Sequence, residues 1–231
     1  MNQIKKQDHV INCGPSFFRM FSFKYGRRFV SCLLPSALCL LLFSCIQQEE
    51  QSLPIFGEKE ITATDTVYHT IGNFRLVNQD STIVTNKTVQ GKIYVADFFF
   101  TSCRTICPIM KTQMMRVYEA VENDPEVLIV SHTIDPEYDT VGLLHDYADR
   151  LGVKSNKWHF LTGSKDSIYH IAQTSYFATA MEAEAEPDGF IHSGAFLLID
   201  KVGRIRGKYD GTKAEEVDKL LKDIEVLKKE G

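Results

Sequence analysis

The feature that most constrains this chain is a pair of cysteines placed directly behind an apolar, aromatic run. Residues 93–100 have the composition of a buried strand, and Cys103 and Cys107 follow it within a few positions. Pro108 favours the first turn of a helix. The stretch therefore predicts a strand-to-helix turn with both sulfurs on one helical face, where the positive end of the helix dipole favours thiolate over thiol.

Two cysteines in this arrangement can bind a soft metal ion or close into a disulfide. The remaining four all fall in the first 45 residues: Cys13, Cys32, Cys39 and Cys45. Two cysteines are too few for a disulfide framework, so they indicate a functional pair. A structural zinc site would require a fourth strong ligand, and the body of the chain has no further cysteine to supply one.

Residues 1–44 are predicted to be a signal peptide of the lipoprotein type. Basic residues precede an apolar stretch over residues 29–43, which is shorter than the roughly 20 residues that a membrane-spanning helix needs. It ends in Leu-Phe-Ser-Cys45, which resembles a bacterial lipobox, whose cysteine is lipidated and becomes the mature N-terminus. An uncleaved signal anchor is the alternative. In both cases we expect an exported, membrane-anchored domain in the bacterial cell envelope, facing the periplasm or extracytoplasmic space.

The composition suits one globular domain with accessory segments, since 44% of the 231 residues are hydrophobic and 24% are charged. Residues 1–44 hold six of the 26 Lys and Arg residues but one of the 30 Asp and Glu residues, which leaves the remainder net acidic by nine. This balance argues against nucleic acid as a partner. Residues 45–66 are polar, contain Pro54 and Gly57, and are predicted to be a flexible tether.

Residues 67–231 alternate between strand and helix patterns. The predicted elements are a hairpin of residues 74–77 and 82–85, strands over 93–100, 127–133, 158–161, 195–199 and 204–206, and helices over 108–121, 140–151, 164–174 and 214–229. Gly152 is a helix stop, and the Ala- and Glu-rich residues 178–188 are predicted to be a loop. This alternation predicts an α/β sheet covered by helices, in a thioredoxin-like layout with an N-terminal β-hairpin extension.

Four motifs in order resemble the SCO/SenC family of copper-binding assembly proteins. They are Thr101-Ser-Cys-Arg-Thr-Ile-Cys-Pro108 after Asp97-Phe-Phe-Phe100, Thr133-Ile-Asp-Pro-Glu-Tyr-Asp-Thr140, Trp158-His-Phe-Leu-Thr-Gly163, and His192-Ser193 before Phe196-Leu-Leu-Ile-Asp200. The match runs from about Phe74 to Lys219.

The resemblance implies a thioredoxin fold, one copper ion bound by Cys103, Cys107 and His192, and a role in maturing cytochrome c oxidase. Two thiolates and an imidazole form a soft, low-coordinate site that suits Cu(I), and the imidazole allows Cu(II) as well. Two positions depart from the family pattern: Arg104 lies where proline is frequent, and Ile191 lies where aspartate is frequent. Neither departure removes a ligand.

Other metal-binding residue types in the body are predicted to have ordinary roles. His132, His145, His159 and His170 lie within predicted strands or helices and are assigned no ligand role. Met110, Met114 and Met115 have the helical spacing of core positions. Asp135 and Asp139 flank a proline in a predicted turn with a helix cap, and the resemblance makes Asp135 a neighbour of the site.

We therefore predict a copper metallochaperone, not primarily an enzyme, that carries one Cu(I) or Cu(II) ion. Its expected partners are a copper-accepting oxidase subunit, another copper chaperone or thiol reductase, and the membrane through lipid on Cys45. The rival function is a thiol–disulfide oxidoreductase that cycles Cys103 and Cys107 and gives His192 no required role. A peroxidase on the same fold would need a peroxide-polarising arginine, and Arg104 is the only cation in the motif.

Overall fold

The computed structural model describes residues 52–182, 190–192 and 194–230. The predicted signal peptide and Cys45 lie outside these residues. Within the described part of the chain, no helix has the length and apolar character needed to cross a membrane.

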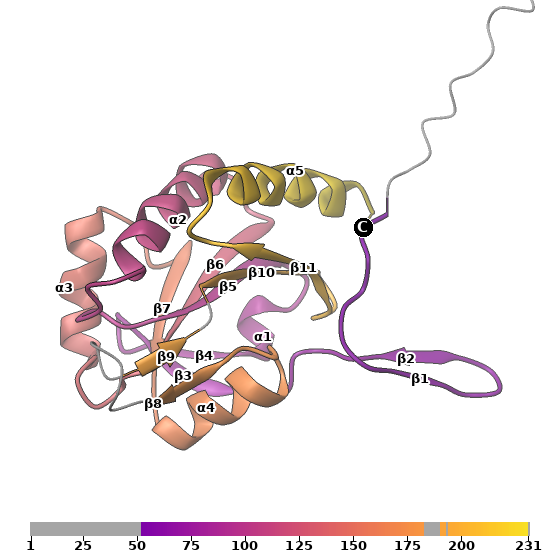
Figure 1. Cartoon of the computed structure of the whole chain (residues 1–231), viewed down its shortest axis with the longest axis horizontal. Helices are drawn as coiled ribbons and strands as arrows, with labels where there is room; N and C mark the ends of the chain where they lie inside the picture. Colours follow the sequence, from indigo (N-terminus) through magenta and orange to yellow (C-terminus); the bar gives the residue numbers. More distant parts are fainter. Residues whose placement is uncertain (1–51, 183–189, 193, 231) are drawn as a thin grey trace, which may run out of the picture. The chain divides into compact units, whose positions relative to one another are not determined.

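A seven-stranded mixed sheet forms the centre of the domain, in the order β11-β10-β5-β6-β7-β3-β4 (Figure 1). Its strands are β3 (Arg75–Asn78), β4 (Ile83–Thr85), β5 (Ile93–Phe99), β6 (Val127–Thr133), β7 (Trp158–Thr162), β10 (Ala195–Ile199) and β11 (Ile205–Asp210). β5, β6 and β7 run parallel, whereas the pairings of β3, β4, β10 and β11 are antiparallel. The fold is thioredoxin-like, and the predicted hairpin, β3 with β4, extends its sheet at one edge.

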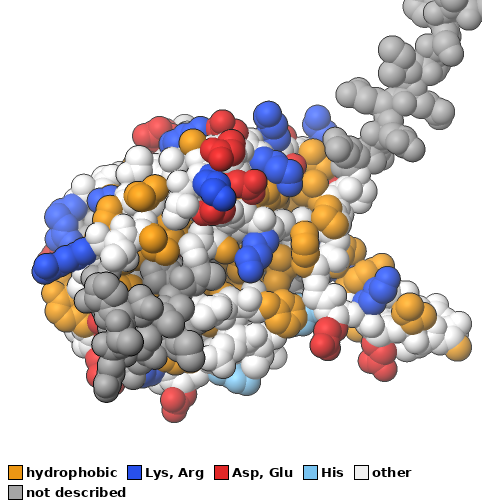
Figure 2. Space-filling model, in the orientation of Figure 1, with side chains coloured by type: hydrophobic (Ala, Val, Ile, Leu, Met, Phe, Trp, Pro, Cys, Tyr) orange, Lys and Arg blue, Asp and Glu red, His pale blue; other side chains and the backbone are white. Residues whose placement is uncertain are grey.

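In the described part of the chain, five helices accompany the sheet: α1 (Asn86–Val89), α2 (Cys107–Val121), α3 (Val141–Leu151), α4 (Lys165–Thr174) and α5 (Ala214–Glu230). In Figure 1, α2 and α5 lie together on one side of the sheet and α4 lies on the opposite side. Charged side chains of both signs are intermixed over α5 (Figure 2). The core between the layers is continuous, with aromatic residues from β5 and β7 and aliphatic residues from β6.

The ends of α3 and α4 have capping interactions, of which the sequence analysis predicted Gly152 alone. The Thr140 side chain accepts a hydrogen bond from the Leu143 backbone N–H at the start of α3. Gly152 ends the same helix in the left-handed region, with φ of 69°. At the start of α4, Ser164 caps the Ser167 backbone N–H. The predicted bounds of α2, α3, α4 and α5 agree with the structure to within one residue, whereas α1 was not predicted.

The described part of the predicted tether has structure of its own. β1 (Lys59–Ile61) and β2 (Thr66–Tyr68) form a small antiparallel hairpin that the sequence did not predict. Every residue of β1 is exposed, so its sequence shows no alternation of apolar and polar residues that would indicate a strand. Leu53 and Pro54, upstream of this hairpin, bind the domain through their backbone carbonyls. Both accept hydrogen bonds from the Arg206 guanidinium, at 2.6 Å for Leu53 and 3.1 Å for Pro54. Residues 53–54 are therefore attached to the domain.

Two other predictions need correction. Residues 178–188 were predicted to be a loop, but β8 (Ala180–Glu182) lies within them and pairs with β9 (Phe190–His192). β11 continues to Asp210, beyond the predicted residues 204–206. Gly207 looks like a strand breaker, yet a Cβ there would lie 2.2 Å from the Tyr209 hydroxyl oxygen, so the glycine makes room for that ring.

Candidate metal centre

The two thiols lie at the N-terminus of α2, as predicted. Cys107 is the first residue of the helix and Cys103 lies in the preceding turn, and both are buried and free of disulfide bonds. The Cys107 backbone N–H donates a hydrogen bond to the Cys103 sulfur at 3.4 Å. The N-cap residue, Ile106, has no side-chain acceptor to offer the helix. The Cys103 sulfur thus accepts one of the backbone donors that a helix start leaves unpaired.

The predicted preference for thiolate is wrong for Cys107. Burial raises the pKa of the Cys107 thiol well above its usual range, and the adjacent Cys103 raises it further. A hydrogen bond from the Phe100 backbone opposes these effects without overcoming them. Loss of solvation is the largest of these effects, so the protonated thiol is favoured at Cys107.

A buried carboxyl lies beneath the thiols. Asp97 of β5 shares with Cys107 a cavity of about 20 Å³, which is room for about one water molecule. The Ser131 hydroxyl donates a hydrogen bond to Asp97 and accepts one from the Trp158 indole N–H at 2.8 Å. Burial raises the pKa of Asp97 to about 7, and the Ser131 hydrogen bond partly opposes this. Sequence reasoning gave Asp97 no role, although a lone acid in an apolar strand was the available signal.

A second buried carboxylate holds the loop that precedes Cys103. Asp139 accepts hydrogen bonds from the Thr101 backbone N–H at 3.1 Å and from the Thr101 and Thr133 hydroxyls. The predicted helix-cap role belongs instead to the neighbouring Thr140. Asp135 accepts a hydrogen bond from the Tyr138 backbone N–H at 3.4 Å within the same turn. Asp139 therefore fastens the thiol loop to the end of β6.

For His192 the structure describes the backbone but not the imidazole. The residue ends β9 and pairs with Ala180 of β8. Two residues later, a Cβ at Gly194 would lie 3.4 Å from Cδ1 of Ile106, the residue before Cys107. Because two residues span at most about 7 Å, the chain returns His192 to the neighbourhood of the thiol turn.

The four histidines of the predicted strands and helices, and the methionines of α2, are placed as ordinary packing or surface residues. His132 and His159 are buried, whereas His145 and His170 are exposed. Met110 and Met114 belong to the core, as predicted, and Met115 packs against it. Among the side chains that the structure describes, no group of three or more His, Cys, Asp or Glu residues is arranged to hold a metal ion. The His192 side chain lies outside that set, so its role as the third ligand stays a prediction.

Comparisons with known proteins agree on one family. The family model described as SCO1/SenC matches residues 62–229. A SCO1 protein homolog from Bacillus subtilis is 31% identical over 162 residues, which cover 69% of this chain and 83% of that protein.

Two solved structures share the fold. A SCO1/SenC family lipoprotein from Bacillus anthracis has a TM-score of 0.63 and 28% sequence identity, over 69% of this chain and 95% of that one. ScoI from Arabidopsis thaliana, crystallised with copper bound, has a TM-score of 0.56 and 29% identity, over 67% of this chain and 97% of that one.

Proposed function

The chain belongs to the SCO1/SenC family, and from this premise we propose that it is a copper metallochaperone. It binds one copper ion through Cys103, Cys107 and His192, and it helps to assemble the copper site of a terminal (cytochrome c) oxidase. Its partners are a copper-accepting oxidase subunit and an upstream copper chaperone or thiol reductase. Lipid on Cys45 holds it at the membrane of the cell envelope.

The observation that carries this proposal is the pairing of the two thiols. The hydrogen bond from the Cys107 backbone to the Cys103 sulfur, at 3.4 Å, holds that sulfur beside the first turn of α2. Two soft donors at one helix start suit Cu(I), and a single imidazole completes a low-coordinate site from which copper can leave. The copper-bound ScoI of Arabidopsis thaliana and the Bacillus anthracis lipoprotein support the cargo and the anchor respectively.

The chain's own groups prepare the site for loading. Cys107 is protonated when copper is absent, because burial raises its pKa, so binding releases a proton and becomes tighter as the pH rises. Asp139 fixes the Thr101 end of the loop, which limits the freedom of Cys103. The two thiols are thus held in place before the ion arrives.

The same pairing also fits the rival function, a thiol–disulfide oxidoreductase. Neighbouring thiols four residues apart can form a disulfide, and Cys107 is held at the pair by its backbone. The two functions differ at His192, which copper binding needs and disulfide exchange does not.

Copper titration of the reduced, detergent-solubilised full chain tests the proposal. We expect about one copper per chain by metal analysis, and loss of stable binding in Cys103→Ser and in Cys107→Ser. His192→Ala should weaken Cu(II) binding severely and leave a weaker two-thiolate Cu(I) site, with disulfide formation intact. His145→Ala is the control, because its exposed ring pairs with Asp80 at 3.2 Å, away from the thiols.

Four outcomes would contradict parts of the proposal. Unchanged copper stoichiometry in both cysteine variants would show that Cys103 and Cys107 do not form the copper site. Unchanged Cu(II) binding in His192→Ala would remove that ligand, and full restoration of oxidase assembly in cells by the same variant would favour the oxidoreductase. An intact mass that begins at Met1 or Met20, measured on membrane-extracted protein, would refute lipidation at Cys45.

A further inference from the structure

Phe177 has a backbone conformation that a bulky residue rarely adopts. Its φ is +50°, in the left-handed region, although it is not glycine. The side chain is 47% exposed, so burial in the core does not explain the conformation. Such backbone strain persists only where the surrounding contacts impose it, and it is concentrated at functional positions.

The strained residue lies where the chain leaves α4 for β8. β8 pairs with β9 through the contacts Ala180↔His192, Met181↔Ile191 and Glu182↔Phe190. The backbone direction at Phe177 therefore sets where the β8–β9 hairpin begins. Through the hairpin register, it also sets where the backbone of His192 lies.

A segment far away in the sequence imposes this conformation. The His69 Nε2 atom lies 2.7 Å from the Ser175 carbonyl oxygen, and the His69 ring packs on the Phe177 ring with centroids 4.5 Å apart. The Gly72 backbone N–H donates a hydrogen bond to the Ser175 hydroxyl at 3.2 Å. A Cβ at Gly72 would lie 2.9 Å from that oxygen, so only glycine allows this approach. Residues 69–72, named the strap here, thus hold residues 175–177, named the hinge.

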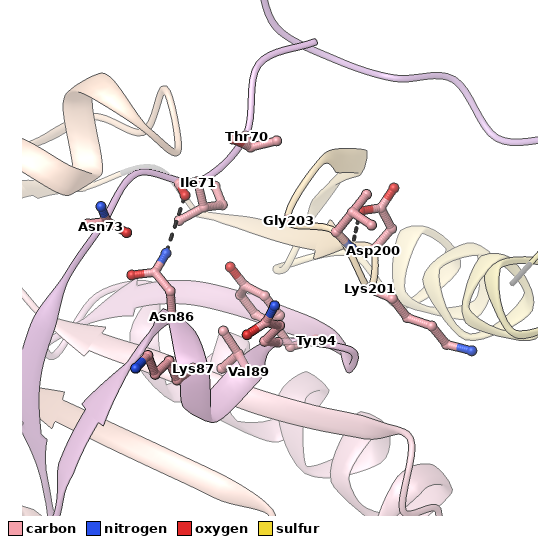
Figure 3. A pocket seen from close by; sticks show the side chains of 12 residues that line it. Thr70, Ile71, Asn73, Asn86, Lys87, Val89, Tyr94, Asp200, Lys201 and Gly203 are labelled. Atoms are coloured by element: carbon pink, nitrogen blue, oxygen red, sulfur yellow. Dashed lines mark hydrogen bonds between the residues drawn. The ribbon is translucent and has the colours of Figure 1, made fainter. Parts of the chain in front are cut away.

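The strap is itself fixed to the body of the domain. The Ile71 backbone N–H donates a hydrogen bond to the Gly203 carbonyl at 2.8 Å, and the Asn86 side-chain amide donates one to the Ile71 carbonyl at 3.3 Å. Figure 3 shows Asn86 reaching Ile71 across the wall of a pocket of about 450 Å³. The pocket is also lined by Tyr94, near the start of β5, whereas the thiols follow its other end. The strap is therefore anchored independently of the thiol turn.

The hinge receives its other support from the core. The Tyr176 hydroxyl lies 3.2 Å from the Tyr94 hydroxyl, and the Tyr176 ring is fully buried. On the outer side, His69 contacts residues 57–58, named the N-terminal arm here. The His69 backbone N–H donates a hydrogen bond to the Glu58 carbonyl at 2.9 Å. A Cβ at Gly57 would lie 2.8 Å from the His69 Cβ, which shows how closely this segment passes. His69 thus lies between the N-terminal arm and the hinge.

We propose that His69 is a positioning residue for the copper ligand His192. The strap braces the hinge in its left-handed conformation, and the hinge directs the β8–β9 hairpin so that His192 is presented to the thiols. The effect on copper binding rests on the proposed function, in which His192 of the hairpin is a copper ligand. The brace itself is a property of the copper-free chain.

The test compares three brace variants with a matched neighbour in the full chain. His69→Ala removes both the ring contact and the bond to Ser175, His69→Phe keeps a ring without that bond, and Phe177→Asn tolerates the left-handed backbone without the ring contact. Tyr68→Ala is the control, because Tyr68 packs under the Arg204 guanidinium at 5.1 Å. Two quantities are measured: hydrogen exchange of the β8 and β9 amides without copper, and Cu(II) and Cu(I) affinities.

We expect His69→Ala to speed amide exchange in β8 and β9 several-fold while exchange in β5 and β6 stays unchanged. Its Cu(II) affinity should fall roughly tenfold, as it does when the competent state drops to about a tenth of the population. Cu(I) held by two thiolates should change less, and His69→Phe and Phe177→Asn should lie between wild type and His69→Ala. If His69→Ala showed the same amide exchange and the same Cu(II) affinity as Tyr68→Ala, His69 would not be a positioning residue for His192. A wild-type chain that binds no copper would instead overturn the proposed function, while the exchange data still decide on the brace.

Discussion

The two faces of the β5–β6 pair bury titratable side chains in opposite ways. Asp97 and Ser131 are register partners on the face toward α2, and the next partners, Phe98 and His132, point to the other face. On the first face the carboxyl has a hydroxyl donor and lies beside the cavity under Cys107. On the second, neither nitrogen of the fully buried His132 ring makes a hydrogen bond of acceptable geometry.

The same physical cause moves the two pKa values in opposite directions. Burial disfavours a charge on either group, so it raises the pKa of Asp97 to about 7 and lowers the pKa of His132 to about 4. The Asp97 backbone opposes the change at His132 only in part. The His132 ring is enclosed by aromatic neighbours, with centroids 5.0 Å from Phe98 and 5.2 Å from Tyr176. One face thus keeps a polar group next to the functional thiols, and the other uses an imidazole as packing.

The largest expected effect is at Asp97. A carboxyl whose pKa rises on folding from 3.8 to about 7 stabilises the fold most below pH 3.8, and this contribution is lost as the pH rises through 7. The lost free energy is about 4 kcal/mol. Denaturant unfolding of the reduced, copper-free protein measures this. Between pH 4 and pH 8, the stability of Asp97→Asn relative to wild type should rise by about this amount. A stability difference that does not depend on pH would contradict a neutral, buried Asp97.

A somewhat smaller effect of opposite sign is expected at His132. Its pKa falls on folding from 6.5 to about 4, so its contribution is present above pH 6.5 and is lost as the pH falls toward 4, by about 3 kcal/mol. His132→Phe should remove this acid sensitivity in unfolding curves measured between pH 4 and 8. The exposed His145→Phe serves as the control and should retain the wild-type profile. An unchanged acid limb in His132→Phe would show that another group causes it.

The smallest effect tests why the two faces differ. Ser131→Ala removes the hydroxyl that donates to Asp97 and accepts from Trp158, so the Asp97 face comes to resemble the His132 face. We expect a loss of about 2 kcal/mol at pH 7, because a buried acceptor and a buried donor lose their partner. The Asp97 carboxyl should also titrate at higher pH in a carbon-13 NMR titration, since the Ser131 bond lowers its pKa. Trp158→Phe is the control, because it leaves the Ser131–Asp97 hydrogen bond in place. If the Asp97 pKa changed equally in both variants, the Ser131 hydrogen bond would not be what lowers it.

Local patterns predicted most of the framework around the thiols. The apolar runs over residues 127–133 and 195–199 are β6 and β10 without change, and Thr140 and Gly152 end α3 as capping chemistry requires. The cysteine turn followed from a buried strand and a proline at the helix start. These signals work because hydrophobic periodicity and caps act within a few residues of the chain.

Longer-range features were missed for a common reason. β1 is exposed at every residue, so no apolar alternation marks it, and its pairing with β2 defines it. β11 was cut short at Gly207 because the space that the Tyr209 ring needs is visible only after folding. The pKa of Cys107 was predicted from the helix dipole alone, whereas its burial depends on how β5 and α2 pack.

The sequence by itself determined the α/β class, the order of the main strands and helices of the domain, and the position of both thiols at one helix start. Those properties depend on neighbours along the chain. Only the tertiary structure decided that Asp97 lies under Cys107, that His132 packs among aromatic rings, and that His69 meets Ser175, a residue 106 positions away. Burial and contact between distant segments are set by which faces pack together, and no local pattern records that choice.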